Sequence, residues 1–305
     1  EQKGKDLIHF EIGDSHLEMP SEVKKSAITS LNAGNTHYGS SYGEHSLRLA
    51  IQKTVKEDFG FTPTISQIVV TSGANPLIYY ILSILVNPGE EVILTDPSFV
   101  TYNTVLSMLK LKGVRIPVSH KNNFRFDPSE IEKRITKKTR LIIVNSPSNP
   151  TGAVYSKNDI KEIYALAKKY NLYILSDEIY SRQIFDGKEM PTFFNYPDLQ
   201  DRLIVLDGWS KAYAMTGWRM GWSVWPEELI PHVTKLIINS FSCVNVPSQF
   251  GGIAALDGPD DPIHEMMKKF DEMGIKYEYS EYPGGHTWPV WRHDLYTFAQ
   301  LLFKQ

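Results

Sequence analysis

The sequence of 305 residues predicts an α/β fold in which helices cover both faces of a mostly parallel sheet. Two patterns support this class. Short runs rich in β-branched residues are apolar at nearly every position, which is typical of strands buried on both faces. The segments between these runs include apolar residues at helical spacing. The sequence contains no internal repeat and no low-complexity linker.

The buried-strand pattern occurs five times along the chain. The expected strands are residues 67–71, 91–95, 141–145, 172–176 and 203–206. An apolar segment over residues 77–86 predicts a helix after the first strand. A second helix is expected over residues 157–170, because Ile160, Ile163 and Ala167 fall on one helical face.

Charge and cysteine content narrow the class of protein. The 32 basic and 35 acidic residues give a net charge of −3 and are spread along the chain, which argues against a nucleic-acid partner. Cys243 is the only cysteine, so a disulfide framework and a cysteine-based zinc site are excluded, and no metal is expected. No apolar run reaches the roughly 18 residues of a membrane span. We expect a cytoplasmic protein.

Ligands of parallel sheets bind at the carboxyl ends of the strands, and chemically suggestive residues follow the predicted strands. Small residues at 72–75 precede a helix, where backbone N–H groups bind phosphate. Phe99 follows the second strand and suits stacking on a flat ring, and a proline-rich loop after the third presents the Asn149 amide. Asp177 ends the fourth strand, where a buried carboxylate needs a partner such as a protonated pyridine. Each feature alone is also explained by a turn, a core side chain or a helix cap.

Lys211 lies among small and aromatic residues, in the segment 207–219. Such surroundings favour a partly desolvated amine with a lowered pKa, which can form a Schiff base. Arg219, eight residues further on, is a planar cation suited to a phosphate. A random pair at this spacing is usually two solvated charges. Next to the four loops above, however, the pair indicates pyridoxal phosphate.

The loops also occur in a characteristic order: Ser-Gly-Ala-Asn, Pro-Ser-Phe, Asn-Pro-Thr-Gly, Asp-Glu-Ile-Tyr, and Ser-Lys followed by Arg. This order resembles the class I/II aminotransferases, the fold type I pyridoxal-phosphate enzymes, from about residue 12 to 270. The resemblance implies a mostly parallel, seven-stranded type of sheet flanked by helices. It also implies an N-terminal arm (1–20), a cofactor-binding large domain (21–245) and an incomplete or atypical small C-terminal domain (246–305).

The resemblance implies roles for five side chains around the aldehyde and the ring of the cofactor. Lys211 would form the Schiff base and then move a proton between the substrate Cα and the cofactor. Asp177 would pair with the pyridine nitrogen, and Phe99 would stack on the ring. Asn149 and Tyr180 would hydrogen-bond the 3′-oxygen.

The phosphate and the substrate are assigned in the same way. Arg219 and the backbone at Ala74 and Asn75 would hold the phosphate. Tyr38 matches the family tyrosine that reaches the phosphate of the neighbouring subunit, which implies a homodimer. Gly13 matches the glycine beside the substrate carboxylate.

After about Phe270 the resemblance stops, and no arginine matches the family residue that binds the substrate α-carboxylate. The tail 271–305 instead resembles the C-terminus of α/β-hydrolase esterases. There His286, in Gly-Gly-His-Thr-Trp, would be the general base, unless its loop is simply rich in glycine. Residues 39–43 match Gly-x-Ser-x-Gly, but no buried strand precedes them as a working nucleophile requires. Arg292 in the tail is more simply a surface arginine than a carboxylate ligand.

The leading interpretation is a pyridoxal-phosphate-dependent aminotransferase that moves an amino group between an L-amino acid and a 2-oxo acid. Three alternatives remain open at this point. One is a pyridoxal-phosphate C–S lyase or β-eliminase, which shares the same motifs. Another is a chimera that binds the cofactor but has impaired turnover, and the third is an esterase that uses His286.

Overall fold

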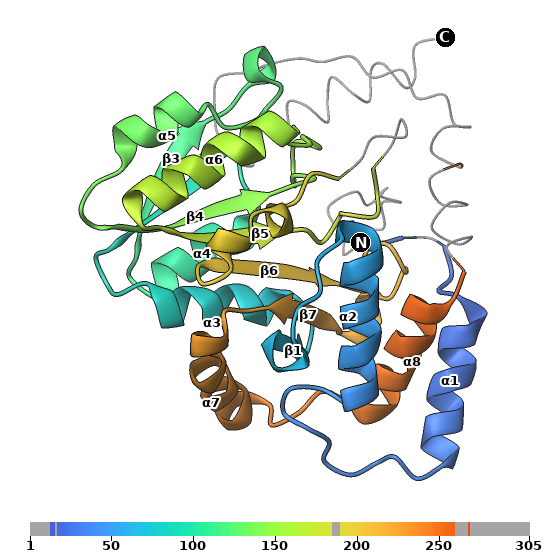
Figure 1. The fold of residues 1–305 in the computed structure, drawn as a ribbon. Coiled ribbons are helices and arrows are strands. Elements are labelled where there is room, and N and C mark those ends of the chain that lie inside the picture. Colours follow the sequence, from blue (N-terminus) through green and yellow to red (C-terminus); the bar gives the residue numbers. More distant parts are fainter. Residues whose placement is uncertain (1–12, 16, 185–189, 260–267, 269–305) are drawn as a thin grey trace, which may run out of the picture.

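A single sheet organises the computed structural model, which describes residues 13–15, 17–184, 190–259 and 268 (Figure 1). Its seven strands run in the order β1-β7-β6-β5-β4-β2-β3. β7 pairs antiparallel with β1 and β6, and the other neighbouring strands are parallel. The strands are β1 (Ile68–Thr71), β2 (Glu91–Asp96), β3 (Lys112–Pro117), β4 (Thr139–Asn145), β5 (Tyr173–Asp177), β6 (Leu203–Gly208) and β7 (Gly221–Val224). The predicted α/β class and all five predicted strands are confirmed.

Two strands, β3 and β7, are not among the five predicted from the sequence. β3 is at the edge of the sheet, where Lys112 and Arg115 are exposed, so it lacks the continuous apolar pattern of a buried strand. β7 is fully buried but only four residues long. It begins at Gly221, where a Cβ atom would lie 2.5 Å from the Ala74 backbone nitrogen. The need for glycine at this close approach obscures a strand signal that is already short.

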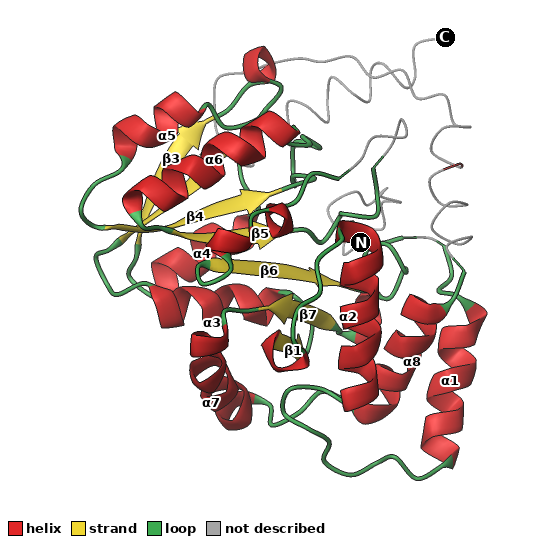
Figure 2. Cartoon of the chain, in the orientation of Figure 1, coloured by secondary structure: helices red, strands yellow, loops and turns green. Residues whose placement is uncertain are grey.

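Helices cover both faces of the sheet (Figure 2). Strand side chains alternate between two apolar clusters, so that Ile142 packs in one and Ile143 in the other. The first cluster includes residues of α1 (Ser21–Asn32), α2 (His45–Phe59), α5 (Pro128–Arg134), α6 (Lys157–Tyr170) and α8 (Val246–Asp257). The second includes residues of α3 (Asn75–Leu85), α4 (Val100–Met108) and α7 (Ile230–Ser240). The sheet is therefore buried on both sides.

Local sequence explains where the two predicted helices begin. α6 starts after Ser156, whose side chain accepts a hydrogen bond from the Asp159 backbone N–H in a capping box. It ends at Asn171 in the left-handed conformation, which matches the predicted range. α3 starts at Asn75, two residues earlier than predicted, and has a proline in its first turn, where a missing N–H costs little.

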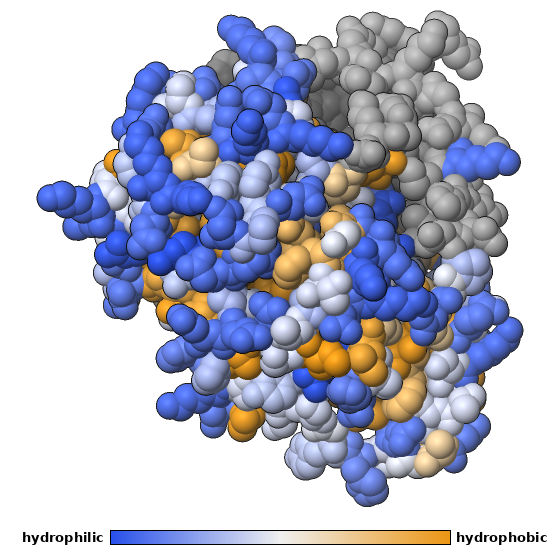
Figure 3. All heavy atoms as spheres, viewed as in Figure 1, coloured by the Kyte–Doolittle hydropathy of each residue, from blue (hydrophilic) through white to orange (hydrophobic). Residues whose placement is uncertain are grey.

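Hydrophilic side chains predominate on the face shown in Figure 3, and apolar side chains appear between them in smaller groups. Within the described ranges, no helix combines the length and apolarity needed to cross a membrane. Ser41 lies in a turn between α1 and α2, and no strand leads into it. His286, Arg292 and the hydrolase-like tail 271–305 lie outside the described residues. The division into arm, large domain and C-terminal segment stays a prediction.

Candidate active site

The carboxyl ends of β1, β2, β4, β5 and β6 meet at one edge of the sheet, because these strands point the same way. The segments that follow them line a cavity of about 190 Å³. Eight of the ten predicted site residues line this cavity: Ala74, Asn75, Phe99, Asn149, Asp177, Tyr180, Lys211 and Arg219. Side chains up to 145 positions apart in the sequence are therefore brought together by the order of the strands.

The other two predicted residues are placed differently. Gly13 reaches the site through its backbone, because its carbonyl oxygen accepts a hydrogen bond from Lys211. Tyr38 lies outside the cavity and lines a separate groove with His37 and Asn245. Tyr38 is 89% exposed and does not line the cavity of its own chain. Its predicted role in a neighbouring subunit stays a prediction.

Asp177 ends β5 and is buried at the bottom of the cavity. Its Oδ2 accepts a hydrogen bond of 2.5 Å from the Tyr102 hydroxyl, and its Oδ1 accepts one of 3.3 Å from the Ile179 backbone N–H. Burial raises the pKa of Asp177 to about 6, while the Tyr102 hydrogen bond acts in the opposite direction. A cationic partner inside the cavity would stabilise the ionised form, as a protonated pyridine nitrogen would.

Asn145, which the sequence analysis did not select, connects the two predicted residues on this side of the cavity. Its Nδ2 donates to the backbone oxygen of Asp177 at 3.1 Å, and its Oδ1 accepts from the Asn149 backbone N–H at 2.7 Å. Asn149 in turn donates from Nδ2 to the Tyr180 hydroxyl at 3.4 Å. Burial raises the pKa of Tyr180, which favours the protonated hydroxyl that can donate to a ligand oxygen.

A positional signal for Asn145 was present in the sequence. It is the last residue of the predicted strand 141–145, and Asp177 directly follows the next predicted strand, 172–176. The two residues are register partners in the sheet. Tyr102 also had a signal, because it follows Phe99 by three positions and so faces the same side at the start of α4.

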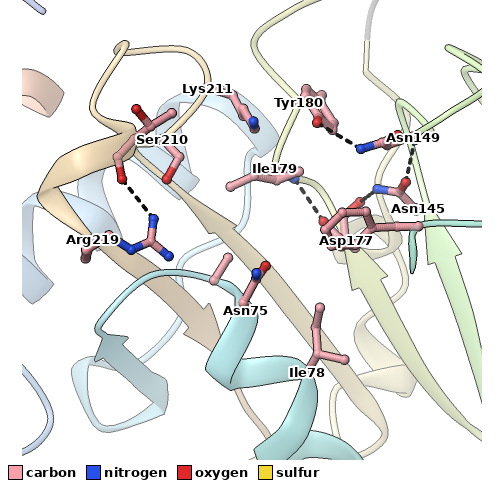
Figure 4. A pocket seen from close by; sticks show the side chains of 13 residues that line it. Asn75, Ile78, Asn145, Asn149, Asp177, Ile179, Tyr180, Ser210, Lys211 and Arg219 are labelled. Atoms are coloured by element: carbon pink, nitrogen blue, oxygen red, sulfur yellow. Dashed lines mark hydrogen bonds between the residues drawn. The ribbon is translucent and has the colours of Figure 1, made fainter. Parts of the chain in front are cut away.

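Lys211 follows β6 and lies half-buried between the two sides of the cavity (Figure 4). Its Nζ donates to the Gly13 carbonyl oxygen at 2.9 Å and lies 5.9 Å from the centroid of the Tyr180 ring. Burial lowers the pKa of Lys211, Asp14 opposes this effect, and the positive charge of Arg219 adds to it. A lowered pKa increases the fraction of neutral amine, which is the nucleophilic form.

Arg219 lies opposite Asp177 and presents its guanidinium at the start of α3 (Figure 4). Its Nη1 donates to the Thr216 carbonyl oxygen at 2.8 Å. The guanidinium also lies close to Gly73, which has a φ of +89°. Only glycine allows this close approach, because a Cβ atom at position 73 would lie 2.5 Å from the Arg219 Nη2. A guanidinium beside the N-terminus of a helix, at Ala74 and Asn75, is a suitable site for a phosphate group.

The three chemical requirements of pyridoxal phosphate are met in one cavity. The phosphate needs a cationic anion site, the pyridine nitrogen needs an acidic partner, and the aldehyde needs an amine. Arg219, Asp177 and Lys211 supply these groups from different sides of the same space (Figure 4). The residues present therefore fit the cofactor.

Known proteins give an independent comparison. Residues 5–277 match the family model of aminotransferase class I and II. A probable aspartate aminotransferase of Methanocaldococcus jannaschii is 37% identical over 273 residues, which are 87% of this chain and 71% of that protein. An arginine–pyruvate transaminase of Pseudomonas aeruginosa is 35% identical over 269 residues, covering 88% of this chain and 68% of that protein.

Solved structures agree with the sequence matches. The aspartate aminotransferase of Rhizobium meliloti superposes with a TM-score of 0.86 at 31% identity, over 89% of this chain and 68% of that one. The aromatic aminotransferase of Pyrococcus horikoshii gives a TM-score of 0.83 at 33% identity, over 86% of this chain and 71% of that one. Fold, site and relatives agree: the chain belongs to the class I and II aminotransferase family and is an aminotransferase, a member of a family that uses pyridoxal phosphate.

Proposed function

We propose that the cavity at the carboxyl edge of the sheet binds pyridoxal 5′-phosphate and transfers an amino group from an L-amino acid to a 2-oxo acid. One observation carries this proposal. The Lys211 amine lies between a buried carboxyl group, Asp177, and a cation at a helix N-terminus, Arg219. The relatives named above are aminotransferases or transaminases, which favours amino transfer over the C–S lyase reaction.

Each protein group has a separate task in this reaction. When bound, the cofactor ring withdraws electrons from the substrate Cα. Lys211 would hold the cofactor through its aldehyde group, and its free amine would take and return the proton at the substrate Cα. Asp177 would keep a proton on the pyridine nitrogen, since a buried carboxylate is stabilised by such a cation. Asn149 and Tyr180, which are hydrogen-bonded to each other, would hold the ring by its 3′-oxygen, and Phe99 would cover it.

The active unit in this proposal is a homodimer in which Tyr38 binds the phosphate held by the other subunit. Support comes from the 89% exposure of Tyr38 and from Leu31, which is 52% exposed on the same groove. Both side chains are therefore accessible to a second chain. We also propose a cytoplasmic location, with which the single cysteine agrees.

The cofactor assignment is tested by visible absorbance and by reduction with borohydride. Purified protein incubated with pyridoxal phosphate is expected to show a Schiff-base band, and mass spectrometry after reduction should place the cofactor on Lys211. Lys211→Ala should abolish both signals, while the exposed Lys161→Ala in α6 serves as the matched control. A wild-type protein without the band would refute the cofactor assignment.

The reaction is tested separately with the loaded enzyme. A panel of amino acids and 2-oxo acids should yield new amino acid only when both substrates are present. Release of pyruvate and thiol from a cysteine-type substrate, without any need for an oxo acid, would instead establish the lyase reaction. Keeping the two assays apart separates a failure of amino transfer from a failure of cofactor binding.

A further inference from the structure

The N-terminal segment Gly13–Asp14 forms a clamp of two hydrogen bonds with the loop that joins β6 to β7. The Gly13 carbonyl oxygen accepts from Lys211 Nζ at 2.9 Å. The next residue, Asp14, accepts from the Thr216 hydroxyl at 2.7 Å through Oδ1. These pairs are 198 and 202 positions apart in the sequence, so the contacts depend wholly on the tertiary fold. The segment is thereby fixed at two points of one loop.

Thr216 connects this clamp to the proposed phosphate site at Arg219, because it is hydrogen-bonded to both. Its hydroxyl binds Asp14, and its carbonyl oxygen accepts from Arg219 Nη1 at 2.8 Å. Thr216 also lines the cavity. A displacement of Thr216 would therefore alter the support of the Arg219 guanidinium as well as the hold on the N-terminal segment.

Asp14 also acts on the Lys211 amine through its charge. Burial favours the neutral amine, and the positive Arg219 acts in the same direction, whereas the negative Asp14 favours the ammonium form. The Gly13 carbonyl oxygen has the same preference as Asp14, because an ammonium group is the better donor. The two neighbouring residues therefore stabilise one state of the lysine, the free and protonated one.

We infer that Asp14 is a positioning residue, whose hydrogen bond to Thr216 keeps the Gly13 carbonyl oxygen next to Lys211. The N-terminal segment then binds the Lys211 side chain whenever the Lys211 amine is not bonded to the cofactor. This inference rests on the proposed role of Lys211. An ammonium group has three N–H donors, and a nitrogen bonded to the aldehyde carbon keeps one at most. The amine is therefore most able to donate to Gly13 in the cofactor-free protein, whereas the Asp14–Thr216 bond does not depend on the state of the lysine.

Four substitutions test separately the Thr216 hydroxyl, the Asp14 acceptor oxygen and the Asp14 charge. Thr216→Val removes the hydroxyl at nearly constant shape, and Thr216→Ser keeps it. Asp14→Ala removes both acceptor and charge, whereas Asp14→Asn keeps an acceptor oxygen and removes the charge. Neither residue is buried in the core, so folding is expected to survive and is checked by the urea midpoint. If a variant fails this check, Lys211→Met breaks the other contact and provides the same readout.

The first readout is hydrogen exchange, measured by mass spectrometry on the cofactor-free protein over the peptide 13–20. Thr216→Val and Asp14→Ala should each speed exchange about fivefold, the effect of one net hydrogen bond. Thr216→Ser and Asp14→Asn should remain close to wild type. Wild-type exchange in both Thr216→Val and Asp14→Ala, or equal acceleration in Thr216→Ser, would overturn the clamp.

The second readout is the pH dependence of the rate at which pyridoxal phosphate forms the Schiff-base band. Asp14→Asn should shift the half-maximal rate to lower pH than in wild type, because the charge that favours the ammonium form is gone. An unchanged pH profile would overturn the electrostatic part of the inference. If wild type shows no band at all, the proposed function fails, whereas the exchange experiment still decides whether the clamp exists.

Discussion

The Tyr102 hydroxyl donates a hydrogen bond to the Asp177 carboxylate at 2.5 Å, from the first turns of α4 to the end of β5. Tyr102 is itself buried, at 1% exposure, so water cannot replace the bond if it is lost. Asp177 lines the cavity, where the pyridine nitrogen of the cofactor is expected, and Tyr102 supports it from the buried side. Tyr102 therefore orients the group that pairs with the cofactor ring.

Tyr102→Phe should weaken cofactor binding about tenfold. The substitution leaves a buried carboxylate oxygen without its donor, and hydrogen bonds to charged groups contribute about 1.5–3 kcal/mol. The pKa of Asp177 should rise above the present value of about 6, because burial continues to raise it while the opposing hydrogen bond is gone. An absorbance titration with pyridoxal phosphate measures the affinity. The exposed Tyr79→Phe in α3 is the matched control, and equal affinities for the two variants would contradict the prediction.

Gly73→Ala should disrupt the anion site. Its Cβ atom would lie 2.5 Å from the Arg219 Nη2, so the guanidinium must move. The left-handed φ of +89° adds strain of about 1–2 kcal/mol. Affinity for pyridoxal phosphate should fall at least tenfold, with Arg219→Ala as a reference for complete loss of the cation.

Gly89→Ala is the control for strain without the clash. Gly89 has a similar φ of +82°, and a Cβ atom there would meet nothing within 4 Å. Both alanine variants should lower the urea midpoint by a similar amount, but only Gly73→Ala should lose cofactor affinity. Equal affinities in the two variants would show that the approach of Arg219 to Gly73 does not matter for binding.

Glu178 predicts a dependence of stability on pH. It is buried beside Asp177, and its Oε2 has no hydrogen-bond partner within the described part of the chain. Burial raises its pKa from 4.5 to about 8, with the charge of Asp207 acting in the same direction. Between these values the folded protein binds the proton that the unfolded chain has already released. The free energy of unfolding should therefore fall as pH rises from about 4.5 to about 8.

Glu178→Gln removes this titration while keeping the shape of the side chain. Between pH 5 and pH 8, the free energy of unfolding of the cofactor-free protein, measured by urea titration, should fall less in the variant than in wild type, by on the order of 1 kcal/mol per pH unit. A remaining fall is expected from Asp207 and Asp177, because burial raises their pKa values to about 7 and about 6. Parallel curves for the two proteins would contradict the assignment of this pH dependence to Glu178.

Local sequence was sufficient for most of the fold. Five strands showed the continuous apolar pattern of burial on both faces, and the order of strand and helix then implied a parallel sheet. β3 lacked that pattern because one of its sides is the edge of the sheet. β7 lacked it because the strand has only four residues and begins with glycine. Both strands are recognised only once their neighbours are in place.

The sequence by itself determined the chemistry of the cavity, because an amine, a guanidinium and a carboxyl group appear at loops whose order along the chain is diagnostic. Lys211, Arg219 and Asp177 were identified in this way, and the sheet brings them to one cavity. Only the tertiary structure decided how these groups are held. Tyr102 supports Asp177, and Asp14 supports Thr216, through hydrogen bonds between residues 75 and 202 positions apart. The geometry of such bonds depends on the packing of the whole chain, which no local pattern of residues encodes.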